Sequence, residues 1–128
     1  MNQTDSKFFL DSSAWLSYFL AQNIEIRGII DSQNVILTSA ISLFEIKRKL
    51  MKDRLNLSKV SVILSYIKEK SLIIKLEQNI CEKAAEISIK ENLHSIDSLI
   101  HTSSLINDCV LVTADNDFRN LKNVMILK

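Results

Sequence analysis

The chain has 128 residues, of which 47% are hydrophobic, and this size and composition suit a single globular domain spanning residues 1–128. Its 16 Lys and Arg residues against 15 Asp and Glu residues leave a formal net charge of +1. A nucleic-acid partner would therefore need a local basic patch or metal ions rather than an overall positive surface. A single glycine and no proline exclude the dinucleotide fingerprint and the phosphate-binding loop, which both need more than one glycine.

Short apolar runs alternate along the chain with longer segments of helical period, which is the pattern of a central parallel β-sheet flanked by α-helices. The predicted strands are Phe8–Asp11, Val35–Thr38, Leu72–Leu76, Val110–Thr113 and Val124–Leu127. The predicted helices are Ser13–Gln22, Ile24–Ile30, Ile41–Arg54, Ser58–Lys70, Ile80–Glu91, Ile96–Ile106 and Asn116–Leu121. No linker or internal repeat divides them, so the sequence predicts one α/β domain.

Four acidic residues end or interrupt these apolar segments: Asp11, Glu45, Asp97 and Asp115. Asp11 and Asp115 stand at the ends of predicted strands, whereas Glu45 and Asp97 lie within predicted helices. Ligands of open α/β sheets bind beyond the carboxyl ends of the strands, so we expect Asp11 and Asp115 at one edge of the sheet. Carboxylates so close to a core need a cation or hydrogen-bond donors.

Each acid taken alone also has an ordinary explanation. Asp11 could cap the helix that follows it, and Asp115 could form an Asx turn. Glu45 could pair with Lys49 one turn later, and Asp97 could be stabilised by the positive amino end of its helix. Asp97 fits its ordinary explanation least well, because its neighbours at helical spacing are neutral Ser and His residues. The four acids together indicate a shared cation site.

The two cysteines, Cys81 and Cys109, lack any zinc-binding spacing and predict free thiols in a reduced, cytoplasmic protein. The segment Phe8–Leu20 is apolar, but Asp11 lies inside it and no small-residue cleavage site follows, so we expect no signal peptide. No apolar run is long enough to predict a membrane span.

Four segments occur in order along the chain: Phe9–Ala14 (FLDSSA), Thr38–Ile46 (TSAISLFEI), Ile96–Ile100 (IDSLI) and Leu111–Phe118 (LVTADNDF). Together they resemble the PIN-domain ribonucleases, and most closely the single-domain VapC-like toxins. The resemblance spans essentially the whole chain. It implies a PIN-like (Rossmann-like) fold.

The resemblance also implies roles for individual residues. Asp11, Glu45, Asp97 and Asp115 would form an acidic metal-binding quartet, with Asp117 as an accessory acid and the hydroxyls of Ser13 and Thr113 as hydrogen-bonding groups. Asp11 and Asp97 would be the central ligands, and Asp115 would complete the set directly or through water. Glu45 would orient the attacking water or support a second ion. Asp117 is explained equally well as a helix cap.

Ligands that are all oxygen favour Mg²⁺ or Mn²⁺ over zinc, and the sequence leaves open whether one or two ions bind. The segment around Asp97, Leu93–Asp97, departs from relatives that often have alanines there. This departure affects the expected local packing and leaves the carboxylate in place.

A run of cations follows Glu45 in the same predicted helix, and further cations follow the turn at Asp115. The candidate RNA-binding residues are Lys47, Arg48, Lys49, Lys52, Arg54 and Arg119, with Lys122 as a weaker candidate. A solvated helix face explains such a run about as well as RNA contact does.

Two groups of apolar residues are predicted to pack. Trp15, Tyr18 and Phe19 are expected in the core or at a subunit interface, and Phe44, Met51 and Leu55 form a helical stripe that predicts core packing.

These observations predict a divalent-metal-dependent endoribonuclease, the toxin of a type II toxin–antitoxin system. The resemblance further implies hydrolysis that leaves a 5′-phosphate and a 3′-hydroxyl, a homodimer, and a small antitoxin protein that blocks the acidic site. The alternative is a non-catalytic PIN-like RNA-binding or assembly module. The intact set of acids argues against that alternative.

Overall fold

The structure, a computed structural model, describes residues 6–128. Within them, five parallel strands form one sheet in the order β3-β2-β1-β4-β5. The strands are β1 (Lys7–Leu10), β2 (Val35–Ser39), β3 (Leu72–Ile74), β4 (Val110–Thr113) and β5 (Val124–Ile126). The helices are α1 (Ser12–Phe19), α2 (Ile24–Ile30), α3 (Ala40–Lys52), α4 (Leu57–Lys70), α5 (Gln78–Glu91) and α6 (Ser95–Ile106), and the 3₁₀ turn η1 covers Asn116–Phe118.

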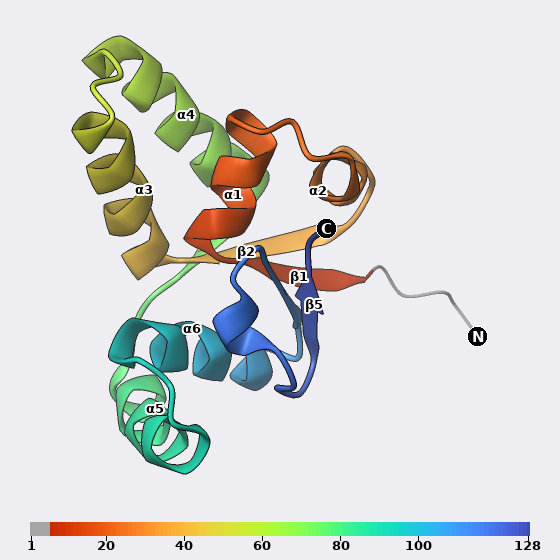
Figure 1. Ribbon diagram of the computed structural model, residues 1–128, viewed down its shortest axis with the longest axis vertical. Coiled ribbons are helices and arrows are strands. Elements are labelled where there is room, and N and C mark those ends of the chain that lie inside the picture. The colour runs from red at the N-terminus through yellow and green to blue at the C-terminus, as the bar shows by residue number, and fades with distance from the viewer. Residues whose placement is uncertain (1–5) are drawn as a thin grey trace.

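The molecule has three layers, with α1 to α4 on one face of the sheet and α5 and α6 on the other (Figure 1). Successive side chains of a strand point to opposite faces, so Phe9 and Leu10 of β1 belong to two different clusters of buried residues. The α/β class and the parallel sheet predicted from the sequence are confirmed. One element differs, because the predicted helix Asn116–Leu121 is a single 3₁₀ turn that cannot continue past Asn120, whose φ is 72°.

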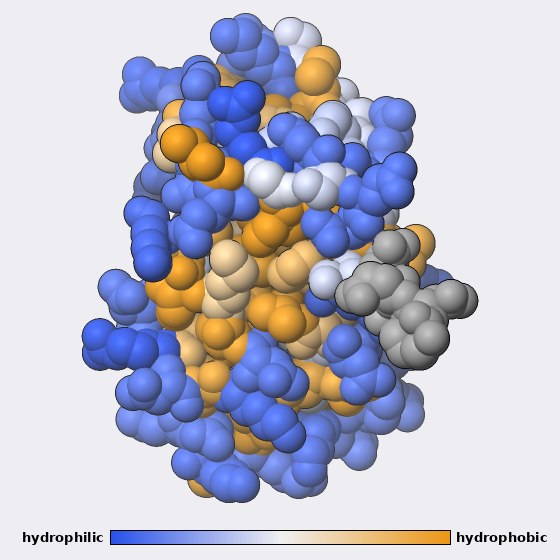
Figure 2. All heavy atoms as spheres, turned by 90° about the vertical axis from the view of Figure 1, so that its right-hand side faces the viewer, coloured by the Kyte–Doolittle hydropathy of each residue, from blue (hydrophilic) through white to orange (hydrophobic). Residues whose placement is uncertain are grey.

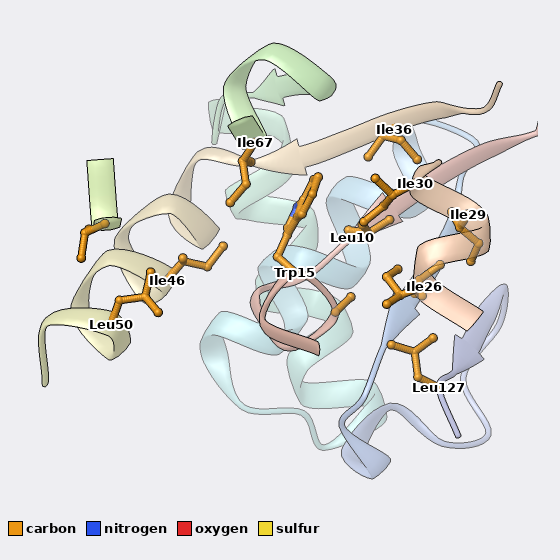
Figure 3. Packing of buried hydrophobic residues seen from close by; sticks show 13 residues of the cluster. Leu10, Trp15, Ile26, Ile29, Ile30, Ile36, Ile46, Leu50, Ile67 and Leu127 are labelled. Carbon is orange, nitrogen blue, oxygen red and sulfur yellow. The ribbon is translucent and has the colours of Figure 1, made fainter. Parts of the chain in front are cut away.

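The larger cluster lies between the sheet and α1 to α4, and Figure 3 shows its side chains converging around Trp15. Trp15 is fully buried, as predicted, while Tyr18 and Phe19 pack partly buried against the cluster. The Trp15 indole N–H donates to Thr38 Oγ1 at 3.0 Å, and that oxygen lies 2.8 Å from Ser71 Oγ. Ser71 in turn donates to the carbonyl of Ile67 at 2.7 Å, so the polar atoms of Trp15, Thr38 and Ser71 form one connected chain.

The predicted packing stripe on the third helix is wrong for two of its three residues. Phe44 is 63% exposed and Met51 is 47% exposed, and only Leu55 packs against the core. The buried side of α3 instead carries Ser42, Ile46 and Leu50, which follow one another at four-residue steps. Phe44 and Met51 lie on a different side of the helix.

Hydrophobic side chains also reach the surface on the face shown in Figure 2, in a band at the height of the sheet. The regions above and below this band are mostly hydrophilic. Among the described helices, none has the length and apolarity needed to cross a membrane.

The turns are made almost without glycine. Residues other than glycine have positive φ angles at six described positions, namely Gln22, Arg54, Asn92, Asp108, Asn120 and Asn123. Four of these are Asn or Asp, whose short polar side chains tolerate the left-handed conformation best after glycine. Asn92 ends α5 directly before α6, and Asn120 and Asn123 follow η1.

Replacing Thr38 by Val should destabilise the fold by about 1–3 kcal/mol, because the buried Trp15 N–H would lose its acceptor while the side-chain shape is kept. Urea denaturation would measure the loss. The matched control is Ser71→Ala, which leaves the Trp15 hydrogen bond intact and should cost less. An equal loss in both variants would contradict this account of the core.

Candidate metal centre

Asp11 is the anchor of the acidic edge, and it is only 6% exposed. It follows β1 and caps α1, since Oδ1 accepts hydrogen bonds from the Ala14 N–H at 2.9 Å and from the Ser13 hydroxyl at 2.7 Å. Oδ2 accepts from the Thr113 hydroxyl at 2.5 Å. Because each carboxylate oxygen offers about two lone pairs, Oδ1 is fully used and Oδ2 retains room for one more partner.

The same hydroxyls also hold the segment after β4. Ser13 Oγ accepts from the Ala114 N–H at 2.8 Å, and Thr113 Oγ1 accepts from the Asp115 N–H at 3.0 Å. The end of β1 is adjacent to the end of β4 in the sheet, where Leu10 is in register with Val112. The two strand ends predicted to share one edge are therefore joined by side-chain hydrogen bonds.

Three carboxylates meet at this edge. Single oxygens of Asp97, Asp115 and Asp117 all lie within 4.8 Å of one another. Asp97 is in the first turn of α6, and Asp115 is the N-cap of η1, where its Oδ1 accepts from the Asp117 N–H at 2.8 Å. The cap position belongs to Asp115, so the alternative explanation of Asp117 as the cap is wrong.

Glu45 approaches the edge from α3 and is partly buried. Burial raises the pKa of its carboxyl, the Ser12 hydroxyl opposes this rise, and the charge of Asp11 adds to it. Its charge therefore interacts with that of Asp11, whereas the oxygens of the close group come from Asp97, Asp115 and Asp117. The structure thus brings two of the predicted quartet, Asp97 and Asp115, together with the accessory Asp117, while the charge of Asp11 interacts with those of Asp115 and Glu45.

The acids repel one another, and none of them forms an ion pair with a Lys or Arg within residues 6–128. Burial, and then the charges of Asp115 and Asp117, raise the pKa of Asp97 to about 6. Burial also raises the pKa of Asp11, against the hydrogen bonds from Thr113, Ser13 and Ala14. The ion pairs within residues 6–128 are Lys49–Asp53 and Lys83–Glu86, and neither involves these acids.

This donor set fits a hard divalent cation. The converging atoms are carboxylate oxygens, which are the ligands that Mg²⁺ and Mn²⁺ prefer. Asp97 and Asp115 are partly buried and Asp117 is exposed, so the group opens to solvent and leaves access for water or a substrate oxygen. Three carboxylates could hold one ion here. The close group contains neither Cys nor His.

The ordinary explanations for the acids hold in part. Asp11 is a helix cap, Asp115 forms an Asx turn, and Asp97 lies at the amino end of its helix. The predicted ion pair of Glu45 with Lys49 is wrong, because Lys49 binds Asp53 at 3.2 Å. A cap or turn occupies only part of a carboxylate, so these roles leave lone pairs for a cation.

The basic residues divide between different surfaces. Arg48, Lys49 and Lys52 line a groove with Glu45, while Lys47 lines a separate groove against α4. Arg54 lies in the turn after α3 with a φ of 65°, and Arg119 and Lys122 are exposed after η1.

Sequence reasoning missed two neighbours of the acids. Ser12 directly follows Asp11 in the chain, and its hydroxyl lowers the pKa of Glu45. His94 directly precedes the helix that carries Asp97, and its charge lowers the pKa of Asp97. Both residues could have been found from the sequence, because Ser12 follows Asp11 and His94 stands three residues before Asp97.

Comparison with known proteins agrees with this architecture. A family model described as "PIN domain" matches residues 8–124. Among solved structures, VapBC2 of Rickettsia felis bound to a promoter DNA fragment gives a TM-score of 0.78 at 15% identity, covering 95% of this chain and 99% of that chain. The VapC20 toxin of Mycobacterium tuberculosis, which cleaves the sarcin–ricin loop, gives 0.75 at 17% identity, covering 94% and 99%. A toxin–antitoxin complex from Klebsiella pneumoniae gives 0.74 at 18% identity, covering 91% and 94%.

A search of curated proteins found no match. The TM-scores show that the solved structures share the fold, and identities below one fifth limit the likeness to the fold. The family model covers nearly all of the chain, from the start of β1 to the start of β5. The chain therefore belongs to the PIN-domain family.

Proposed function

We propose that this protein is a divalent-metal-dependent endoribonuclease that hydrolyses RNA phosphodiester bonds. The observation that carries the proposal is the group of three aspartates at the carboxyl edge of the sheet, which form no ion pair among the described residues. Such a group binds protons or cations at neutral pH, because the carboxylates repel one another. Membership of the PIN-domain family supports a nuclease.

Asp97, Asp115 and Asp117 would hold the ion, and Asp11 would add Oδ2. A bound Mg²⁺ or Mn²⁺ would lower the pKa of water, orient the scissile phosphate and offset charge on the phosphate and leaving oxygens. This assignment gives Asp117 a larger role than the sequence did, since its oxygen belongs to the close group.

The remaining residues of the edge would position and move protons. The backbone around Asp115 is held by hydrogen bonds that involve the side chains of Asp11, Ser13 and Thr113. Glu45 would orient the attacking water and accept its proton, since burial and the charge of Asp11 bring its pKa closer to neutrality. The products would carry a 5′-phosphate and a 3′-hydroxyl. Arg48, Lys49 and Lys52, in the groove beside Glu45, would contact RNA phosphates.

We further propose that the protein acts in the cytoplasm as the toxin of a toxin–antitoxin pair. The solved structures with the same fold include toxin–antitoxin complexes and a toxin that cleaves an RNA loop. A small antitoxin protein would then cover the acidic edge. A homodimer is part of the same proposal.

Cleavage of structured RNAs by the purified protein should require Mg²⁺ or Mn²⁺ and should stop in chelator. Asp97→Asn should lower the rate by about 100-fold or more, because it removes a central charge of the proposed ion site. The matched control is Asp108→Asn at the opposite end of α6, which should cleave normally. Gel analysis of end-labelled RNA measures the cleavage rates of wild type with and without chelator and of the two variants.

Cleavage that persists in chelator, or equal rates in the Asp97 and Asp108 variants, would exclude the metal mechanism. A protein that binds RNA but cleaves none under any metal condition would instead be a non-catalytic RNA-binding module.

The stability of the metal-free protein should depend on pH through Asp97. Its folded-state pKa of about 6 exceeds the ordinary value of 3.8, so the folded state binds the proton more tightly than the unfolded state. The stability from protonation is complete below pH 3.8 and is lost as pH rises through about 6. Asp97→Asn should therefore exceed wild type in stability at neutral pH, by about 1–2 kcal/mol after solvent screening.

Thermal unfolding in chelator across this pH range would measure the effect, and saturating Mg²⁺ should reduce it by stabilising the charged wild type. A constant difference between the two proteins at every pH would contradict the assignment of the shift to Asp97.

A further inference from the structure

An exposed aromatic ring stands next to the acidic edge. Phe44 is the residue before Glu45, and 63% of its surface is accessible. Met51, seven residues later on the same side of α3, is 47% exposed. The core takes other residues of α3, so packing within the described chain does not account for either side chain.

The ring borders a groove between α1 and α3. Ser12 and Leu16 line it from α1, and Phe44, Glu45, Arg48, Lys49 and Lys52 line it from α3. Glu45 is the one acid among these seven lining residues, and its charge interacts with that of Asp11. The groove therefore contains one of the acids assigned to the proposed cleavage site, and Ser12, which follows Asp11 in the chain, lines it too.

The charge of the groove favours a polyanion. Three of its seven lining residues are cations. Lys49 is paired with Asp53, whereas no ion pair within residues 6–128 involves Arg48 or Lys52. Protein-docking surfaces are enriched in aromatic residues, Met and Arg but depleted in Lys, and two of the three cations of this groove are Lys. Single-stranded nucleic-acid sites combine a basic groove with an exposed aromatic ring.

We propose that this groove holds an unpaired nucleotide of RNA beside the cleavage site, with its base stacked on Phe44 and the adjoining phosphates against Arg48 and Lys52. The inference rests on the proposed nuclease function and names its substrate class as RNA that is single-stranded next to the cut. A paired base cannot stack on a side chain, because its faces are occupied by its neighbours in the helix. The Phe44 site should tolerate any base, since every base has a π face.

Binding can be measured separately from cleavage. The probe is a fluorescein-labelled single-stranded RNA of mixed sequence, about 12 nucleotides long and within the range of single-strand binding sites, titrated with full-length protein in chelator. Phe44→Leu keeps an apolar side chain but removes the ring, and it should weaken binding by about 5-fold to about 100-fold. Phe44→Tyr should bind like wild type. Ile89→Ala, an exposed apolar residue on α5 across the sheet, is the matched control and should change nothing.

The cations give an independent readout. Arg48→Gln and Lys52→Gln should each reduce the slope of log affinity against log salt by about 0.7, as expected for loss of one phosphate contact to a single strand. Lys90→Gln, which removes the same charge from α5 on the other face of the sheet, should leave the slope unchanged.

Equal RNA affinities of wild type and Phe44→Leu would overturn the proposal. So would an unchanged RNA affinity combined with weaker self-association of Phe44→Leu in sedimentation, which would identify the ring as a contact between protein copies. If RNA binds as expected but is never cleaved in Mg²⁺ or Mn²⁺, the nuclease function fails while the binding groove stands. If RNA is cleaved but Phe44→Leu binds and cleaves normally, the groove fails alone.

Discussion

The hydrogen bond from the Thr113 hydroxyl to the Asp11 carboxylate is the contact on which the acidic edge depends. It joins two parallel strands that are neighbours in space but about a hundred residues apart in the chain. Through Ser13 and the backbone N–H groups of Ala114 and Asp115, the same contact sets the start of α1 and the turn that carries Asp115. A buried carboxylate would destabilise the fold without such donors, so the anchor and the charge require each other.

The other acids of this edge repel one another in the folded protein. Asp97, Asp115 and Asp117 come from two segments on either side of β4, and the fold holds them close enough that their mutual repulsion and burial favour a proton on Asp97. A structure selected for stability alone would separate these charges or pair them with Lys or Arg. The ion pairs of the described residues instead join Lys49 to Asp53 and Lys83 to Glu86, and Arg48 and Lys52 line the groove beside Glu45. This separation of charge is typical of a functional site.

Much of this arrangement follows from sequence because its signals are local. Apolar runs of four or five residues predict the strands, and Asp11 and Asp115 fall at strand ends whose shared edge is a general property of parallel sheets. The burial of the α3 side chains is harder to predict from sequence. Phe44 and Ile46 are both apolar, and only the packing of α1 and α4 decides which of them is buried. The same holds for the basic run, which helical geometry divides between two grooves. The role of Asp117 depended on where η1 begins, because Asp115 takes the cap position and leaves Asp117 inside the turn.

The scarcity of glycine has a consequence for the unfolded chain. The turns that frame the acidic edge, at Asn92 before α6 and at Asn120 and Asn123 after η1, have left-handed backbones on residues with full side chains. Glycine would fit these turns with less strain, but it would also widen the range of conformations open to the chain before folding, by an entropy worth about 0.4–1 kcal/mol per position. The chain thus accepts strain in the folded turns and loses less disorder in forming them. The turns around the acidic edge therefore have fewer backbone conformations in the unfolded chain than glycine turns would have, and this restriction does not depend on a bound ion.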